Sequence, residues 1–539
     1  MKSLSFNNQR LFIKTNSTAI CFLLIIVAAT LLRFYQIELN GIWVDESNTI
    51  IIAQKNIGGI NDALANDASP PLFYSILHFW MMIFGQSEYS VRSLSAIFGI
   101  ILTGVIFIAG SDLFNRKIGL FSAIICATAP LQIMYSQQCR MYSLLPLTGL
   151  LAMYFFIKFI KKNNYSYFFW YVFFIICTIF THHYGFLLIP VQFILILFLG
   201  PKKIKVPLIT IILIGAVFRY KLWLPKIIGL FLPQKPGTVG WMDFFWNKYG
   251  FFGSQFKSFE SFVPGGPLPP YVAMNSLPWQ PLIPVFFCIL LIVPAVKPYI
   301  FSKTHTQHEK ESTFWVLIYA FIPLFCAAVY SLLFKPSYLA GRCDQIVFPA
   351  FCLIFASGIY YLKNTYAQSV AIIIMLAFSF FTLNTHYSVD YLPGDRLIAN
   401  TVRENLKTGD AVICTSLTRA SLEYYLRDKK DSIKFYSFPI ENARHLAWHN
   451  PLSSLKNPEM LKRNVKEIDE TINNKKNGTG RIILIFERHP VNAPLMNFYK
   501  TKNSLFDIKA SNWIPQAGTN IKAKVFVLDP VMVSADPYL

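Results

Sequence analysis

Residues 18–47 read TAICFLLIIVAATLLRFYQIELNGIWVDES, an apolar run that is followed by two adjacent carboxylates. The apolar part has the length that an α-helix needs to cross the hydrocarbon core of a bilayer, about 20 residues. Asp45 and Glu46 follow just beyond it, and carboxylates at the mouth of a membrane are costly unless they have a function. Between Asp112 and Asp243 the chain has no Asp or Glu. If the chain is an enzyme, its general base is therefore expected at this first pair.

The composition predicts a polytopic membrane protein. The chain has 539 residues, of which 54% are hydrophobic, and a soluble domain does not bury that much apolar surface. The net charge of +21 raises the question of nucleic acid, but much of the excess lies in short loops between apolar segments. There it fits membrane topology and attraction to anionic lipid head groups, so no nucleic-acid partner is expected. The nine cysteines show no metal-ligand spacing and do not imply disulfides.

Eleven segments are predicted to be transmembrane helices: 18–37, 91–111, 118–136, 142–160, 167–183, 185–200, 206–222, 279–296, 313–334, 345–362 and 367–384. The polar residues 1–17 do not resemble a cleavable signal, so the first segment is expected to remain as an anchor. With the N-terminus inside, every inside segment is basic, as the positive-inside rule requires. The basic residues of these segments are Lys2, Arg10, Lys14, Arg116, Lys117, Lys161, Lys162, Lys202, Lys203, Lys205, Lys297, Lys303, Lys310 and Lys363.

One further apolar segment, 71–85, is short and begins at the pair Pro70-Pro71. If it crossed the membrane, every later loop would be inverted and the lysine clusters would lie outside. We therefore predict a helix that lies on or dips into the outer face, with a full span as the alternative.

The predicted topology leaves three external regions. Residues 38–90 and 221–278 are external loops of a membrane domain, 1–385, and the second loop is rich in Pro, Gly and aromatic residues. The composition of that loop fits two alternatives equally well, a lid over a membrane-facing cavity and a passive connector. Residues 386–539 alternate short strand-like and helical stretches, which predicts an external C-terminal α/β domain. Its expected strands are 410–416, 481–487 and 522–529.

Six motifs together resemble one family in order and spacing, over about residues 15–385. They are WVDES (43–47), SPPLFY (69–74), VRSLSAIFG (91–99), YSQQCRMYSL (135–144), THHYG (181–185) and GRCDQIVFPAF (341–351). The family is the bacterial branch of the protein-O-mannosyltransferase and aminoarabinose-transferase superfamily, the GT-C glycosyltransferases. The resemblance implies the GT-C fold, with about eleven transmembrane helices plus interfacial helices.

The resemblance also implies a reaction. Family members take a sugar from a polyprenyl-phosphate carrier on the outer face and transfer it to an acceptor with inversion of the anomeric centre. Inversion needs a base that removes the acceptor's proton. The departing lipid phosphate needs cations, because negative charge grows on it in the transition state. The expected partners are a polyprenyl-phosphate sugar donor, membrane lipid, and a glycan, lipid or protein acceptor.

The resemblance assigns catalytic roles to the first carboxylate pair. Asp45 occupies the position of the family's base, and Glu46 is expected to support it. Arg140 and Arg342 lie at external ends of spans, where a guanidinium can clamp a phosphate with two hydrogen bonds. Snorkelling to the interface is the alternative for Arg140. Cys343 departs from the family pattern, which usually has tyrosine after the arginine.

Other polar residues near the external face are candidates for substrate binding: Tyr142, His182, His183 and Asp67. Tyr142 serves either as a substrate contact or as an aromatic-belt anchor. The two histidines are adjacent, so they project about 100° apart on a helix and one metal ion would rarely take both. A divalent metal is allowed but not required, because arginines can supply the positive charge, and no cofactor is assigned.

Three smaller expectations accompany these. Ser69 stands where the family commonly has histidine. Arg92 is expected to form an ion pair with Asp67 or Glu88. Arg33, inside the first span, reads as a snorkelling residue rather than a catalytic one.

Two other functions are compatible with parts of the sequence. Intramembrane charges also mark transporters and flippases of amphipathic substrates, but the polar residues here gather at one face rather than at the bilayer midplane. A non-catalytic scaffold is the third alternative, since residues 386–539 contain no recognisable catalytic constellation. The expected location is the bacterial inner membrane, with the active site and the C-terminal domain on the periplasmic side.

Overall fold

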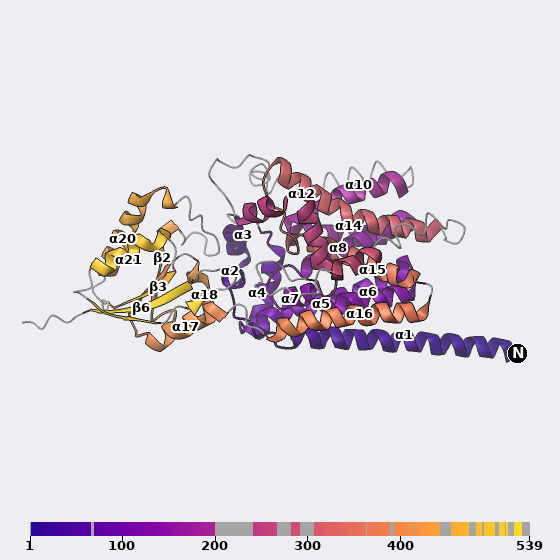
Figure 1. Cartoon of the computed structure of the whole chain (residues 1–539), viewed down its shortest axis with the longest axis horizontal. Coiled ribbons are helices and arrows are strands. Elements are labelled where there is room, and N and C mark those ends of the chain that lie inside the picture. The colour runs from indigo at the N-terminus through magenta and orange to yellow at the C-terminus, as the bar shows by residue number, and fades with distance from the viewer. Residues whose placement is uncertain are drawn as a thin grey trace, which may run out of the picture. The chain divides into compact units, whose positions relative to one another are not determined.

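The computed structural model describes residues 2–65, 69–199, 241–266, 282–290, 307–362, 364–388, 393–415, 417–441, 454–473, 481–487, 490–501, 506–511, 514–515 and 522–530. The chain forms two compact units. One, here called the membrane unit, comprises Met1–Ile37, Asp67–Gln234 and Trp241–Val389. The other, the C-terminal unit, comprises Glu38–Asn66, Lys235–Gly240 and Asp390–Leu539. Figure 1 shows that the first is helical and that the second contains the strands.

The described part of the membrane unit is built from helices. They are α1 (Lys2–Phe34), α4 (Leu72–Phe84), α5 (Glu88–Leu113), α6 (Arg116–Thr128), α7 (Pro130–Ser136), α8 (Leu144–Lys162), α9 (Tyr165–Thr181), η1 (His183–Leu187), α10 (Leu188–Leu199), α12 (Trp241–Phe262), α14 (Gln307–Leu333), η2 (Cys343–Val347), α15 (Phe348–Tyr361) and α16 (Thr365–Ser388). Among the described residues, six helices are long and apolar enough to cross a membrane, or up to seven if a bent pair counts as one. The predicted span 206–222 lies outside the described residues, and 279–296 lies only partly within them.

The predicted span 118–136 is not one straight helix. It consists of α6 and α7, which bend by 59° relative to each other. Pro130 begins α7, and Ala129 before it is extended, with φ −67° and ψ 116°. Proline has no N–H to donate, and it disfavours helical geometry at the preceding residue. The hydropathy pattern did not predict this break, because proline interrupts the helical backbone while the residues around it remain apolar.

The short apolar segment after Pro70-Pro71 does form a helix. This is α4, with 13 residues, which gives a length of about 20 Å. The hydrocarbon core of a bilayer is about 30 Å thick, so α4 is too short to cross it untilted. Its placement on the outer face stays a prediction.

Helices α5 and α6 approach closely through small residues. A Cβ on Gly119 would lie 2.6 Å from the carbonyl oxygen of Phe107, and one on Gly110 would lie 2.9 Å from the Cα of Gly119. Close backbone approach at small residues is a common way for helices to associate in membranes. The α5–α6 pair is therefore tightly packed.

The C-terminal unit contains a mixed sheet in the order β2-β1-β3-β6-β4, with β5 paired to β6. The strands are β1 (Ala411–Thr415), β2 (Lys434–Phe438), β3 (Ile482–Glu487), β4 (Phe506–Ala510), β5 (Ile514–Pro515) and β6 (Lys522–Pro530). β1 pairs in parallel with β2 and β3, whereas β6 is antiparallel to β3, β4 and β5. The three predicted strands correspond to β1, β3 and β6, and β2, β4 and β5 were not predicted.

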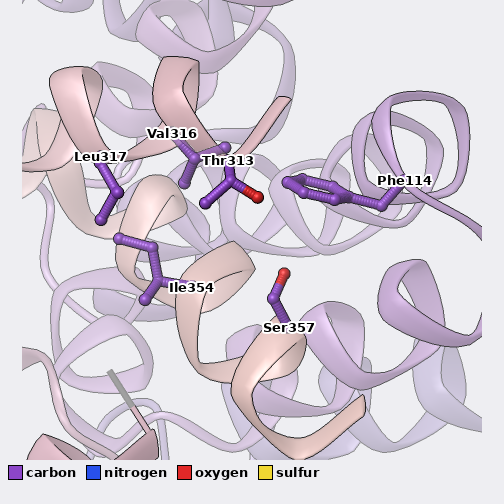
Figure 2. A pocket seen from close by; sticks show the side chains of 6 residues that line it. All are labelled: Phe114, Thr313, Val316, Leu317, Ile354 and Ser357. Carbon is purple, nitrogen blue, oxygen red and sulfur yellow. The ribbon is translucent and has the colours of Figure 1, made fainter. Parts of the chain in front are cut away.

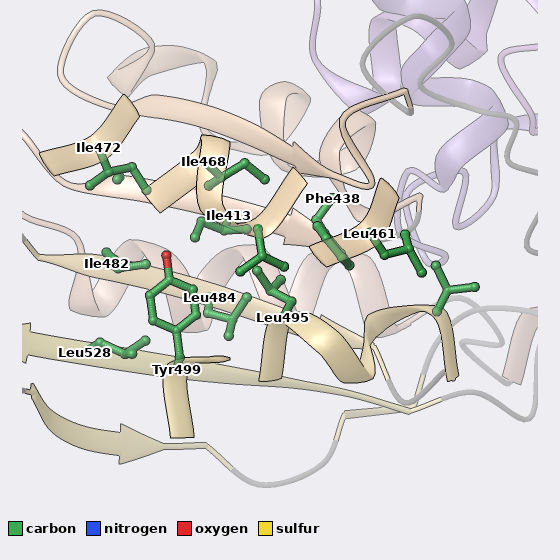
Figure 3. Packing of buried hydrophobic residues seen from close by; sticks show 13 residues of the cluster. Ile413, Phe438, Leu461, Ile468, Ile472, Ile482, Leu484, Leu495, Tyr499 and Leu528 are labelled. Atoms are coloured by element: carbon green, nitrogen blue, oxygen red, sulfur yellow. The ribbon is translucent and has the colours of Figure 1, made fainter. Parts of the chain in front are cut away.

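Alternating residues of β1 and β3 serve two hydrophobic cores, one on each face of the sheet. Val412 and Ile483 pack with α17 (Pro393–Asn405) and α18 (Thr418–Tyr425). Ile413 and Leu484 pack on the opposite face with α20 (Pro458–Asn473) and α21 (Ala493–Thr501), as Figure 3 shows. The sheet is therefore covered by helices on both sides, as expected for an α/β domain.

Two helices from the start of the chain belong to the C-terminal unit. They are α2 (Val44–Ala53), which carries the WVDES motif, and α3 (Ile57–Ala65). Helix α2 packs against α18. The described part of the unit around the sheet thus comes from two stretches of sequence that are more than 300 residues apart.

Candidate functional site in the membrane unit

The first part of the candidate site is the buried turn between α7 and α8, which holds Arg140 and Tyr142. Gln137 fixes the start of this turn, because its side-chain amide donates to the carbonyl oxygens of Arg33 at 3.1 Å and Tyr35 at 2.8 Å. Ser95 of α5 donates its hydroxyl to the carbonyl oxygen of Arg140 at 3.2 Å. These bonds explain how a turn without regular secondary structure keeps a defined shape in the interior of the unit.

The second part is the turn before η2, which holds Arg342. Its side chain reaches the first turn: the Nε of Arg342 donates to the hydroxyl of Tyr142 at 2.7 Å. Gly341 has φ +75°, a left-handed conformation that glycine adopts without steric cost. The sequence separation of 200 residues shows that the two arginine motifs converge only through the fold.

Both guanidinium groups lie near one aromatic ring. The guanidinium carbon of Arg342 is 5.3 Å and that of Arg140 5.8 Å from the centre of the Tyr142 ring. Each arginine is only 8% exposed. Two like charges held this close and largely away from water repel each other. An anion placed between or beside them would relieve that repulsion, so the arrangement favours an anionic ligand such as a phosphate.

The paired histidines lie beside this cationic cluster. The ring of His182 is 6.2 Å from that of Tyr142 and 6.3 Å from that of His183. Electrostatic interactions link His182 to both Arg140 and Arg342. Its Nδ1 accepts the backbone N–H of Tyr184 at 3.1 Å, which fixes the ring orientation and directs Nε2 elsewhere. A neighbouring pair of cations makes this a poor position for a metal ion and a good one for a polar contact to an anionic substrate.

A buried carboxylate that the sequence reading missed fixes the Arg342 turn. The hydroxyl of Ser258, on α12, donates to Asp344 Oδ2, and the backbone N–H of Gly341 donates to the same oxygen at 3.1 Å. Ser258 also bonds to the hydroxyl of Tyr338, at 2.8 Å. Asp344 lies in the GRCD motif, but its partner Ser258 is 86 residues away in a stretch with no recognisable pattern. Only the acid itself was therefore visible in the sequence.

The remaining predicted site residues lie either in the C-terminal unit or outside the described residues. Asp45 and Glu46 lie in the first turn of α2, in the C-terminal unit, where Glu46 is buried and Asp45 partly exposed. Carboxylates there are stabilised by the partial positive charge of the helix N-terminus. Asp67 lies outside the described residues. Among the residues that the structure describes, no three His, Cys, Asp or Glu side chains are grouped as metal ligands would be.

The two other arginines are structural. Arg92 pairs with Glu88 at 3.7 Å, as predicted, and donates to the carbonyl oxygen of Ile37 at 2.9 Å. Arg33 does not snorkel. It is fully buried and donates to the carbonyl oxygens of Cys126 at 3.0 Å and Ala127 at 3.1 Å. These carbonyls belong to the last turn of α6, where a cation satisfies the unpaired groups of a helix C-terminus.

A small pocket elsewhere in the membrane unit is not a substrate site. It has a volume of about 10 Å³ and is lined by Phe114, Thr313, Val316, Leu317, Ile354 and Ser357. Figure 2 shows the hydroxyl groups of Thr313 and Ser357 facing it. That volume accommodates about one water molecule, which is too little for a sugar.

Comparisons with known proteins agree with this architecture. Residues 68–223 match the model of the family described as dolichyl-phosphate-mannose-protein mannosyltransferase. No curated protein sequence gives a significant match. The structure resembles that of ArnT from Cupriavidus metallidurans bound to undecaprenyl phosphate, with a TM-score of 0.58 at 12% sequence identity over 94% of this chain and 97% of that one.

A second similar structure is an archaeal protein. It is the oligosaccharyltransferase AglB from Archaeoglobus fulgidus in complex with an inhibitory peptide and a dolichol-phosphate. The TM-score is 0.51 at 11% identity, covering 97% of this chain and 75% of AglB. The apo form of ArnT gives a TM-score of 0.57 at 12% identity, over 95% of this chain and 98% of that one.

The fold is that of a GT-C membrane glycosyltransferase, a multi-pass helical unit joined to a smaller domain with a sheet. The family match adds a sequence similarity across residues 68–223, which is less than a third of the chain. The fold that the resemblance in the sequence implied is thereby confirmed. The matched region contains Arg140, Tyr142 and both histidines, whereas Asp45 and Arg342 lie outside it.

Proposed function

We propose that this protein is an inverting glycosyltransferase that moves a sugar from a polyprenyl-phosphate donor to an acceptor hydroxyl or phosphate. The observation that carries the proposal is the pair of buried arginines that share the Tyr142 ring. A lipid-linked sugar brings a phosphate to the membrane surface, and this cluster is built to bind one. The solved ArnT structure, which holds undecaprenyl phosphate, supports the same donor class.

In the proposed reaction, the acceptor oxygen attacks the anomeric carbon while Asp45 takes the acceptor's proton. The bond between that carbon and the phosphate oxygen breaks, and its electron pair stays with the polyprenyl phosphate. Arg140 and Arg342 stabilise the negative charge that develops there. Tyr142 orients Arg342, and one histidine contacts the sugar or the phosphate. Glu46 supports Asp45.

The proposal includes a location and a side. The protein acts in a bacterial inner membrane, with its donor site open to the lipid and its acceptor on the periplasmic face. A divalent metal is not required, because the two arginines supply positive charge at the leaving group. The acceptor is a glycan, a lipid or a protein.

The test uses the purified full-length protein in detergent with a panel of polyprenyl-phosphate sugars and follows the release of free polyprenyl phosphate. Wild type is compared with Arg342→Gln and Asp45→Asn, with Lys117→Gln, at the exposed start of α6, as the control. Sugar-dependent release that falls at least a hundredfold in the two site variants and is unchanged in the control supports the proposal.

Two outcomes contradict parts of it. Release that survives Asp45→Asn removes Asp45 as the base but keeps the reaction class. No release from any donor, even with membrane extract as the source of acceptor, would overturn the glycosyltransferase and favour a transporter or flippase of lipid-linked substrates.

A further inference from the structure

The segment that carries the proposed base is held on both sides by the C-terminal domain. Helix α18 contributes two residues to this grip, Ser421 and Tyr425. They are four positions apart and therefore share one face of the helix. The backbone N–H of Ile42 donates to the hydroxyl of Tyr425 at 2.7 Å. The hydroxyl of Ser47 lies 3.4 Å from that of Ser421. Asp45 lies between these two attachment points.

A third attachment precedes them. Arg396, on α17, donates from its guanidinium to three successive carbonyl oxygens, those of Glu38 at 2.8 Å, Leu39 at 3.4 Å and Asn40 at 3.2 Å. A planar guanidinium that binds several carbonyls fixes the path of the backbone there, because its donors have a rigid geometry. The chain is thus restrained before it enters α2.

The attachment at Ser421 is anchored within the domain. The Ser421 hydroxyl donates to Asp395 Oδ2 at 2.6 Å, and Ser47 and Ser421 are both buried. A hydroxyl whose proton is given to a buried carboxylate has a defined orientation. The Ser47 hydroxyl donates within its own helix, to the carbonyl oxygens of Val44 at 3.0 Å and Trp43 at 3.1 Å. The two serines therefore form a close polar packing contact between α2 and α18, and the stronger hydrogen bond is the one at Tyr425.

We infer that the C-terminal domain positions the Asp45–Glu46 pair for catalysis, through Arg396, Tyr425 and Ser421. The inference rests on the proposed function. The three are positioning residues, and none of them needs to contact substrate. Because reactive groups must be held close to their productive geometry, a displacement of about 1 Å can reduce turnover about a hundredfold. This gives the α/β domain a role in the reaction although its sequence shows no recognisable catalytic constellation.

The experiment separates positioning from folding with matched variants of the full-length protein. Tyr425→Phe removes the acceptor for the Ile42 N–H but keeps the ring. Tyr499→Phe makes the same change on the opposite face of the sheet. Arg396→Gln removes the carbonyl clamp and Arg396→Lys restores a cationic donor. Arg419→Gln is the control for charge, because Arg419 bonds to Glu423 and Ser437 instead.

Two readouts are measured. The first is amide hydrogen exchange of the peptide that spans residues 38–53, which needs no substrate. The second is kcat and KM for the polyprenyl-phosphate sugar that supports release by the wild type. We expect Tyr425→Phe and Arg396→Gln to accelerate exchange in that peptide and to lower kcat about tenfold with little change in the donor KM. Arg396→Lys should recover part of kcat, and both controls should match wild type.

Several results would overturn the inference. Faster exchange with unchanged kcat shows that the domain holds the segment without serving the reaction, and leaves the proposed function intact. Unchanged exchange in both variants shows that the contacts do not restrain the segment. Equal loss of kcat in Tyr499→Phe assigns the effect to general destabilisation. If the wild type is inactive with every donor, the proposed function itself is wrong. This case can be told apart from failure of the positioning inference, because the hydrogen-exchange result does not depend on a donor.

Discussion

At the scale of single residues, the two units both rely on a hydroxyl to hold a buried charged group. Tyr142 accepts a hydrogen bond from Arg342 in the membrane unit, and Ser421 donates one to Asp395 in the C-terminal unit. A charge removed from water is costly unless its hydrogen bonds are replaced. Each hydroxyl therefore has a measurable effect, on ligand binding in the first case and on stability in the second.

Replacement of Tyr142 by Phe tests the arginine cluster. The variant keeps the ring but leaves the Arg342 Nε–H without its acceptor, a loss of about 1–2 kcal/mol. We expect roughly a tenfold rise in the donor KM, measured by polyprenyl-phosphate release. Tyr154→Phe, in the middle of α8, where the hydroxyl bonds to Asp112, is the control. An unchanged KM in Tyr142→Phe would show that the hydroxyl does not orient the clamp.

Asp395 predicts a pH dependence of the C-terminal unit. Burial raises the pKa of this carboxyl to about 6, and the hydrogen bond from Ser421, which lowers the pKa, offsets only part of that rise. An unfolded aspartate has a pKa of about 3.9. Between these two pKa values the folded carboxyl keeps the proton that the unfolded one loses. The raised pKa therefore stabilises the folded state fully below the unfolded pKa, and this contribution is lost as the pH rises through the folded pKa. The difference corresponds to about 3 kcal/mol.

The measurement is denaturant unfolding of the full chain at pH 4.5 and pH 7.5, followed by hydrogen exchange in the β1 and β3 peptides. Wild type and Asp395→Asn are compared at each pH, so that other titrating groups cancel. The variant should gain stability relative to wild type as the pH rises. A difference that stays constant between the two pH values would contradict a raised pKa.

At the scale of elements, the α5–α6 pair shows how close packing sets tolerance to substitution. Gly119→Ala would place a methyl group against the backbone of α5, and the resulting strain should lower the unfolding free energy by about 1–3 kcal/mol. Gly104→Ala is the control on α5, because its nearest neighbour would be Phe22 at 3.9 Å, an ordinary contact. Thermal unfolding in detergent should separate the two variants, and equal melting temperatures would refute the close approach.

The sequence predicted those elements whose signal is local. Hydrophobic runs located the helices, and alternation located β1, β3 and β6. Strands β2, β4 and β5 were missed because KFYSF, FDIKA and the two-residue IP are too short or irregular to show a period. The bend at Pro130 was missed because hydropathy averages across it. Each failure is one in which a short stretch or a single residue decides the geometry.

The sequence named the candidate site residues but not how the fold arranges them. Arg140 and Arg342 were visible as cations at span ends, yet their shared ring, Tyr142, emerged only from the fold. Asp344 could not be assigned because its partner, Ser258, is distant in sequence. The grip of α18 on Ile42 and Ser47 had no local signature at all. Contacts between distant segments depend on tertiary structure, which no periodicity encodes.

At the scale of the whole molecule, the distribution of basic loops predicts which parts face each side of the membrane. We expect Asp431→Cys, in an exposed turn of the C-terminal unit, to react in intact cells with a membrane-impermeant maleimide. Lys117→Cys, at the exposed start of α6, should react only after the membrane is opened. Both positions are exposed, and the predicted topology places them on opposite sides of the membrane. Labelling of both variants from outside would contradict the predicted topology. Labelling of Lys117→Cys alone would indicate the inverted topology.

Because Glu38–Asn66 belongs to the same compact unit as Asp390–Leu539, the boundary of the C-terminal domain in space is not a single boundary in sequence. A chimera that exchanged only the residues after 389 with those of a relative would replace Arg396, Ser421 and Tyr425 but keep the old segment that they hold. Recombination between proteins that share this fold is therefore expected to succeed when both pieces come from the same parent. Residues 38–66 and 390–539 should therefore be exchanged as one unit.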